Sequence, residues 1–208
     1  LHHAQVGTQM AAVLGQPLDQ LGPDVLREGR LRRFTAACAP WIYRADLFPA
    51  DAYGDAFVCE PAGNLIKRNF ITSEAGTLSA REAYEKKEFI ASTDERFRPV
   101  NIFNGPDGAL YVVDLYRGII QHRIYLTSYL RKQADERGLA QPRALGRIWR
   151  IVPEGAPAAN FRRVALAKAS SADLVARLSD DRGWVICKAR ARRGGAGAKA
   201  PLRRSAVT

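Results

Sequence analysis

A tight turn between two short apolar runs constrains the fold more than any other feature of this sequence. Residues 104–108, Asn-Gly-Pro-Asp-Gly, combine a proline that presets φ with glycines that allow the positive φ of a closing turn. The flanking residues 100–103 and 109–113 are rich in β-branched and aromatic side chains, which is typical of strands. We therefore predict an antiparallel hairpin.

The order of short strands around this hairpin predicts a repeated β unit. An earlier set of strands is expected at residues 40–44, 55–59, 64–70 and 86–91. The later set comprises residues 100–102, 109–113 and 146–152, which correspond to the first three members of the earlier set. A period of ~55 residues fits a four-stranded propeller blade better than a pair of sandwich strands. The later copy carries an insertion at residues 116–145, of which residues 125–137 have helical spacing.

The C-terminal part changes in composition after Pro153. Residues 155–159 are a small-residue linker, and residues 170–173, Ser-Ser-Ala-Asp, are expected to cap a helix at residues 174–178 with serine as the N-cap. A turn precedes Trp184, where a second helix is expected to begin, so this segment predicts the opening of a helical repeat. The fold class is mainly β, a partial propeller of about two blades followed by a short α-helical repeat segment. The expected segments are an irregular 1–30, the propeller part 31–153, the linker and helical repeat 154–185, and a disordered tail 186–208.

The positive charge of the chain is concentrated in that tail. The net charge is +11, but residues 186–208 hold seven basic residues and no acidic residue, and they show no periodic apolar face. We therefore predict a disordered tail and no specific nucleic-acid partner, since the tail has no aromatic residue to stack on bases. No run approaches the ~18 apolar residues of a membrane-spanning helix, so no transmembrane segment is expected.

Several motifs together resemble a known family. They are Phe-Val-Cys-Glu-Pro at residues 57–61 with Asn64-Leu65, residues 91–94 with 97–101, and residues 105–114 with Tyr116-Arg117. These are similar to the large secreted bacterial "membrane-bound dehydrogenase" proteins, over residues ~31–185. The resemblance implies a propeller like that of soluble pyrroloquinoline-quinone sugar dehydrogenases, then HEAT-type repeats and often a c-type haem domain. It also implies export to the periplasm or beyond.

The resemblance implies a function for the longer protein. It would oxidise a sugar or related alcohol and pass electrons to a quinone or haem acceptor, with pyrroloquinoline quinone and Ca²⁺ as possible cofactors. The alternative is a non-catalytic propeller scaffold that binds glycan or protein, because one fold hosts many functions. The chain has no Cys-x-x-Cys-His haem motif and only about two of six implied blades. We therefore expect an inactive fragment with its haem acceptor outside this chain, no metal-ligating residue assigned, and the catalytic base in missing blades.

Six polar residues are candidates for the propeller channel or its upper rim: Arg98, Asn101, Asp114, Tyr116, Arg117 and His122. Arg98 and Arg117 would pair with an anionic quinone or substrate through their planar guanidinium groups. Asp114 would orient one of them or bind a cation, and Asn101 would donate to a carbonyl of the ligand. The alternative is structural: an Asp114–Arg117 ion pair closes the blade, Asn101 satisfies a turn and His122 is a structural histidine.

Two of the three cysteines are expected to form a disulfide. Cys38 precedes the first strand of its unit and Cys59 ends the second, so antiparallel pairing brings them together. The implied export would let the bond persist. The alternative is two buried, reduced thiols. Cys187 is expected to be a free thiol.

Overall fold

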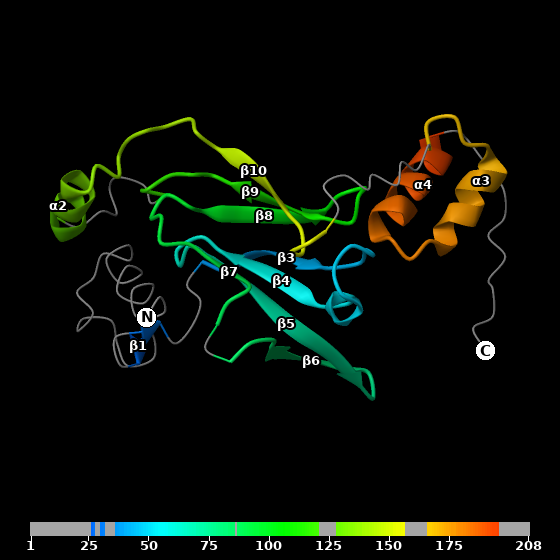
Figure 1. The fold of residues 1–208 in the computed structure, drawn as a ribbon, viewed down its shortest axis with the longest axis horizontal. Coiled ribbons are helices and arrows are strands. Elements are labelled where there is room, and N and C mark those ends of the chain that lie inside the picture. Colours follow the sequence, from blue (N-terminus) through cyan, green and yellow to red (C-terminus); the bar gives the residue numbers. More distant parts are fainter. Residues whose placement is uncertain are drawn as a thin grey trace.

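The computed structural model describes residues 26–27, 30–31, 36–85, 87–120, 128–156 and 166–195, and this part of the chain is mainly β. Its larger sheets are antiparallel and lie one above the other (Figure 1). The first sheet has the order β3 (Cys38–Ile42), β4 (Ala56–Glu60), β5 (Leu65–Glu74) and β6 (Thr77–Glu82), and β7 (Ile90–Ala91) also pairs with β5. The second has the order β8 (Pro99–Asn104), β9 (Leu110–Asp114) and β10 (Arg147–Ile151). A separate pair, β1 (Leu26–Arg27) and β2 (Arg30–Leu31), precedes them.

The predicted hairpin is confirmed as β8 and β9. Asn104 lies opposite Leu110, and Gly105 N donates to Ala109 O at 2.8 Å. Gly108 has a φ of 82°, a conformation that costs glycine little and other residues more. A Cβ at this position would also lie 2.9 Å from the Leu47 side chain, so the turn packs directly on the loop after β3.

The repeated strand order is also found, with one correction. Strands β3, β4 and β5 form the same antiparallel meander as β8, β9 and β10. The fourth strand predicted at residues 86–91 is wrong except for the two residues of β7. The fourth strand is β6, which is exposed along its whole length and so lacks the apolar alternation that marks a half-buried strand. The two sheets do not close into a ring.

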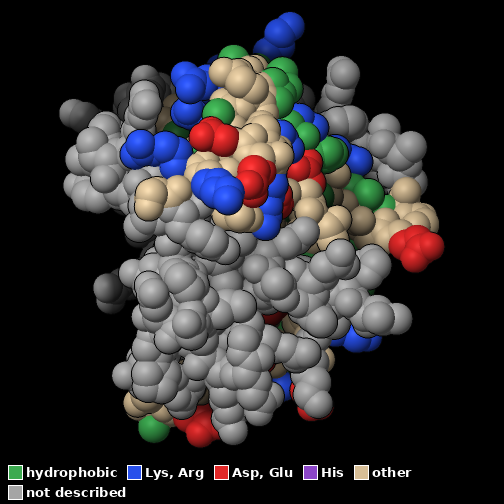
Figure 2. Space-filling view, turned by 90° about the vertical axis from the view of Figure 1, so that its left-hand side faces the viewer, with side chains coloured by type: hydrophobic (Ala, Val, Ile, Leu, Met, Phe, Trp, Pro, Cys, Tyr) green, Lys and Arg blue, Asp and Glu red, His purple; other side chains and the backbone are tan. Residues whose placement is uncertain are grey.

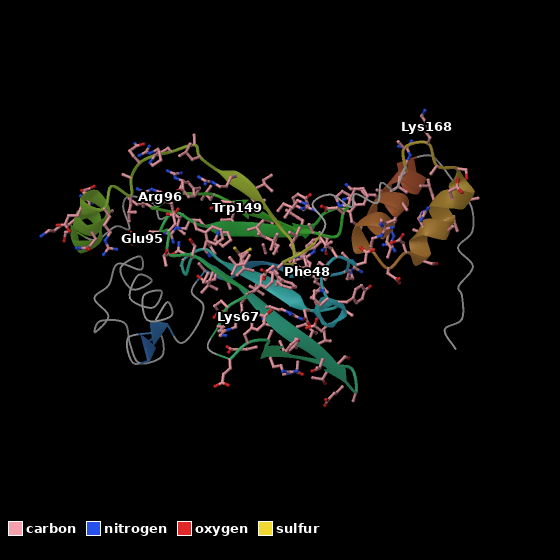
Figure 3. All side chains as sticks on the ribbon, viewed as in Figure 1. Phe48, Lys67, Glu95, Arg96, Trp149 and Lys168 are labelled. Carbon is pink, nitrogen blue, oxygen red and sulfur yellow. The ribbon has the colours of Figure 1, made fainter. Side chains whose placement is uncertain are left out.

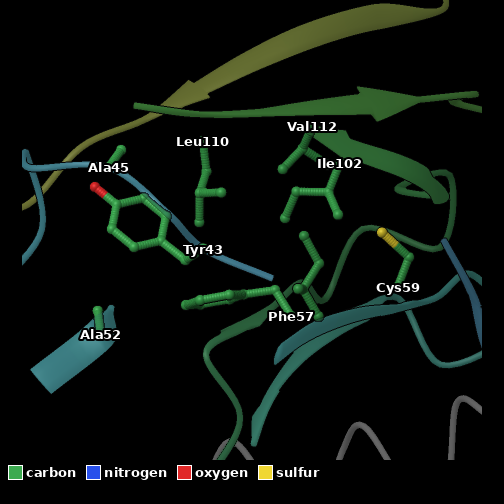
Figure 4. Close-up of a cluster of buried hydrophobic side chains, with 9 residues drawn as sticks. Tyr43, Ala45, Ala52, Phe57, Cys59, Ile102, Leu110 and Val112 are labelled. Carbon is green, nitrogen blue, oxygen red and sulfur yellow. The ribbon is translucent and has the colours of Figure 1, made fainter. Parts of the chain in front are cut away.

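The hydrophobic core lies between the two sheets (Figure 4). Phe57, Cys59 and Ile66 of the first sheet face Ile102, Leu110 and Val112 of the second, and all are 0–1% exposed. Tyr43 completes the core beside them. Its hydroxyl donates to Gly108 O at 2.8 Å and accepts from Phe48 N at 2.9 Å, so the buried polar group is satisfied.

The described helices are α2 (Ser128–Glu136), α3 (Ser171–Ala176) and α4 (Gly183–Gly195), with 3-10 turns η1 (Ala50–Ala52) and η3 (Arg177–Ser179). Helix α2 lies in the predicted insertion. Ser170 caps α3 as predicted, and it exchanges hydrogen bonds with Asp173 in a capping box. The prediction of disorder is wrong for residues 186–195, because α4 continues through them. Val185 and Ala189 are one turn apart and fully buried, and alanine and arginine favour helices.

Two sets of contacts join these helices to the sheets. At the start of α4, Gly183 N donates to Arg44 O at 2.8 Å. On the opposite side, an ion pair and hydrogen bonds join the insertion that carries α2 to the loop before β8 (Figures 1 and 3). Arg137 pairs with Glu95 at 2.6 Å, and Arg96 donates to the carbonyls of Gly138 and Gln141. The insertion is therefore held against the end of the second sheet.

The predicted approach of Cys38 and Cys59 is found, but the bond is not. They are opposite one another in the β3–β4 register, yet both are free thiols, as is Cys187. Burial, with a smaller contribution from nearby Cys38, raises the pKa of Cys59 to about 12, so this thiol is a poor nucleophile at neutral pH. Directly opposed residues have Cα atoms about 4.5–5.5 Å apart, within the range of a disulfide.

The disulfide stays a prediction for protein exported to an oxidising compartment. Closing a loop of about 20 residues would stabilise the fold by about 3 kcal/mol in the chain-entropy model. Thiol titration of unfolded, unreduced protein from its native compartment is expected to count one free cysteine. The matched sample after reduction should count three. A count of three without reduction contradicts the bond and weakens the case for export.

Candidate functional site

Arg98 lies just before β8 and is fully buried. Its Nε donates to Arg117 O at 2.9 Å, Nη1 to Pro61 O at 2.7 Å and Nη2 to Gly118 O at 2.7 Å. Burial lowers the pKa of Arg98 to about 10, which leaves the guanidinium charged at neutral pH. Its donors therefore bind backbone carbonyls of the two sheets' loops, and the side chain is not aimed at a ligand.

Asp114, the last residue of β9, is also buried and is fully engaged. Its Oδ1 accepts from the backbone N–H groups of Arg98 and Tyr116, both at 2.8 Å. Its Oδ2 accepts from Nε1 of Trp149 at 2.9 Å. A carboxylate surrounded by N–H donors does not fit a cation site. Within the described residues it forms no ion pair with Arg117, so the blade-closing pair in the structural alternative is also not present.

The first sheet has a counterpart of this carboxylate. Glu60 ends β4 as Asp114 ends β9, and both carboxylates are buried. Glu60 accepts from the N–H of Ala36, two residues before β3, whereas Asp114 accepts from Arg98, one residue before β8. An acid at the end of the second strand thus fixes the entry to the first strand in each sheet.

The other predicted site residues are not brought together. Asn101 accepts from the neighbouring Ile102 N–H at 2.9 Å, which is a local contact. The side chain of Arg117 is exposed, and Arg98 binds only the backbone carbonyl of this residue. His122 lies outside the described residues. Of the six candidates, the structure therefore assembles Arg98, Asp114 and Tyr116.

A surface cluster lies directly over Asp114, and we call it the aromatic platform: Tyr116, Arg147 and Trp149. The Arg147 guanidinium carbon lies 3.5 Å from the Tyr116 ring centroid and 5.5 Å from that of Trp149. Trp149 is 41% exposed, although its Nε1 is anchored to a buried carboxylate. Trp149 lies on β10 and is labelled in Figure 3. The platform therefore holds a half-buried guanidinium against the Tyr116 ring and leaves part of the anchored Trp149 ring exposed to solvent.

Tyr116 adopts an unusual backbone conformation within the platform. Its φ is +46°, the left-handed region that non-glycine residues rarely adopt. The hydrogen bond from its N–H to Asp114 and the stacked Arg147 hold it there. Such a conformation costs of order 1 kcal/mol, and residues held this way cluster at functional sites.

Sequence reasoning missed Arg147 and Trp149. They lie 33 and 35 residues after Asp114, beyond the insertion, and only the β9–β10 register places them beside it. A signal was present in β10, where the adjacent Ile148 and Trp149 place large apolar side chains on both faces of the strand. A strand that is apolar on both faces must either be covered on both sides or expose one of these side chains.

The described surface at the α2 end carries charged side chains of both signs. Figure 2, viewed from the α2 end, shows basic and acidic side chains close together. In the described part of the chain, no group of three or more His, Cys, Asp or Glu residues could hold a metal ion. No described helix is long and apolar enough to cross a membrane.

Comparison with known proteins identifies one match. The sequence model of a domain of unknown function, DUF7133, matches residues 3–155. The matched region includes both sheets, Arg98 and the aromatic platform, and ends before α3. No curated protein and no solved structure matches the chain.

The Arg98 contacts predict a large effect of a conservative substitution. In Arg98→Lys, a single ammonium group replaces the planar fork and cannot reach carbonyls of both loops, so buried acceptors lose their donors. We expect the free energy of unfolding to fall by about 3 kcal/mol in urea titrations followed by circular dichroism. The matched control Arg117→Lys changes an exposed side chain and is expected to stay within about 0.5 kcal/mol of wild type. Equal stability of the two variants contradicts the role of Arg98.

Proposed function

The chain belongs to the DUF7133 family, and we propose that it is the part of a carbohydrate-active β-propeller protein that binds sugar at the aromatic platform. The observation that carries this proposal is the exposed Trp149 ring held by buried Asp114. A fixed, exposed aromatic face attracts the polarised C–H bonds on the face of a sugar ring, because the π-face is electronegative. The Arg147 guanidinium beside it supplies donors to sugar hydroxyl groups.

Two features of the sheets support a β-propeller as the fold of this region. They are consecutive antiparallel meanders, and they pack face to face through one core, as adjacent blades do. The end of β9 and the start of β10, where the platform lies, would then be part of the propeller's rim. The hairpin of α3 and α4 that follows fits a first HEAT-like repeat.

The full-length protein is proposed to oxidise the bound sugar or a related alcohol and to pass electrons to a quinone or c-type haem acceptor outside this chain. Support comes from the motif resemblance together with the sugar-compatible platform. The site residues described here do not fit pyrroloquinoline quinone or Ca²⁺. Arg98 is engaged by carbonyls and Asp114 by N–H donors, so no step is assigned to either group in this chain.

The second candidate function is a non-catalytic scaffold that binds glycan. This candidate is favoured by Arg98 and Asp114, because both side chains are engaged in hydrogen bonds within the protein. Dye-linked oxidation of sugars by the full-length protein, with and without added quinone and Ca²⁺, separates the candidates. Oxidation supports the dehydrogenase, whereas sugar binding without oxidation in any condition supports the scaffold. Both candidate functions include export of the protein to the periplasm or beyond.

Sugar binding by this chain can be tested through its three tryptophans, Trp41, Trp149 and Trp184. Titration with glucose, xylose or cellobiose is expected to shift the indole N–H resonance of Trp149 in ¹H–¹⁵N spectra and to leave that of Trp184 in place. Binding is expected in the millimolar range, about −4 kcal/mol, for a small open surface. Trp149→Phe and Arg147→Ala should each weaken it roughly fivefold or more, because each loses a contact of about 1 kcal/mol.

The matched control is Trp184→Phe, which changes a side chain packed in the helical pair. Its sugar affinity should equal that of wild type. Thermal melts of all variants confirm folding. Equal shifts of all three indole resonances would contradict the proposal, as would the absence of any shift with all of the sugars.

A further inference from the structure

The register of the two sheets identifies equivalent residues. Glu60 lies opposite Leu65 in the first sheet, and Asp114 lies opposite Arg147 in the second. Superposing these pairs makes four apolar positions of the first sheet equivalent to four of the second: Trp41 with Phe103, Phe57 with Tyr111, Cys59 with Val113 and Ile66 with Ile148.

These equivalent faces differ in what covers them. In the first sheet, Phe57, Cys59 and Ile66 are 0% exposed, because the second sheet packs on them. In the second sheet, Ile148 is 66% exposed and Phe103 is 41% exposed, although Trp41 contacts the edge of the Phe103 ring. We call Phe103, Tyr111, Val113 and Ile148 the outer face. Among the described helices and strands, Figure 1 shows none over the side of the second sheet that is turned away from the first.

An ion pair borders the apolar residues on each face. Arg68 of β5 pairs with Asp55 at 2.6 Å, and the equivalent Arg150 of β10 pairs with Asp107 at 2.7 Å. Both aspartates lie in the turn before the second strand of their sheet. The outer face therefore repeats the covered face in its apolar positions and in its charged border.

We propose that the outer face binds a third antiparallel sheet, supplied by the full-length protein outside this chain. The covering face would present aliphatic side chains like Ile102, Leu110 and Val112, which cover the equivalent positions of the first sheet. A second copy of the chain cannot supply this surface, because its own aliphatic face is already buried against its first sheet. The inference deepens the propeller proposed above and is independent of sugar binding.

The test measures thiol reactivity at position 148. Ile148→Cys is made in the full-length protein and in this 208-residue chain, and alkylation is followed by peptide mapping, which separates the new thiol from Cys38, Cys59 and Cys187. The matched control is Leu78→Cys, on the exposed strand β6, where Leu78 is 72% exposed. Both variants are expected to react at similar rates in the isolated chain. In the full-length protein, the thiol at 148 should react roughly tenfold more slowly than the thiol at 78.

Two outcomes overturn the proposal. Similar rates at 148 and 78 in the full-length protein would show that nothing covers the outer face. Slow alkylation of the thiol at 148 in the isolated chain, together with the mass of a dimer in light scattering, would show that a second copy covers the outer face. Sugar titration of the same full-length variants separates this proposal from the proposed function. Failure to bind sugar would contradict the sugar site, whereas only the alkylation rates test whether the outer face is covered.

Discussion

The structure depends on one buried cation, Arg98. Removing a guanidinium from water is costly, and the lowered pKa of Arg98 reflects that cost. Carbonyls of Pro61 and Gly118, from the loops of two different sheets, offset it. The negative charges of Glu95, Asp114 and Asp94 act in the same direction. Because the first sheet contributes one loop and the second the other, this side chain fixes their relative position as well as its own.

The aromatic platform follows from that arrangement. Arg98 fixes the chain leaving β9 by binding Arg117 O, and its own N–H binds Asp114. Asp114 then has one oxygen left for Trp149, which arrives from β10. The exposed ring is thus positioned by Asp114 and Arg98, which are both buried beneath the surface. Such a supporting layer is what holds a surface aromatic residue in one orientation without burying it.

The sequence predicted the local parts of this fold well. The hairpin, the repeated strand order, the helix in the insertion and the Ser170 cap all depend on residues close together in the chain. Strand β6 was missed because an exposed edge strand carries no apolar alternation. The start of α4 at Gly183 agrees with the second helix expected at Trp184. Its continuation through residues 186–195 was missed because the buried positions there are few and small, with Ala189 among them.

The site was harder to predict, because its contacts join distant segments. Arg98 has the chemistry of an anion-binding residue, and only the positions of Pro61 and Gly118 show that its donors are engaged. Asp114 was correctly placed at a strand end, but its partner is Trp149, 35 residues away, rather than Arg117. No local pattern encodes such a pair. The two residues that give the site its exposed chemistry were therefore the two that the sequence did not single out.

The repeat separates the part of the site that belongs to both sheets from the part that is found in the second sheet only. Glu60 and Asp114 are equivalent and both fix the entry of their sheet, so the acid at this position belongs to the scaffold. The positions equivalent to Tyr116, Arg147 and Trp149 in the first sheet are Ala62, Leu65 and Lys67. Ala62 and Leu65 are buried, whereas Trp149 is exposed. Both sheets share the strand order and an acid at this position, whereas the platform also needs the positive φ of Tyr116, which Ala62 does not adopt. The platform therefore arises from side chains and one local backbone change on a scaffold that both sheets share.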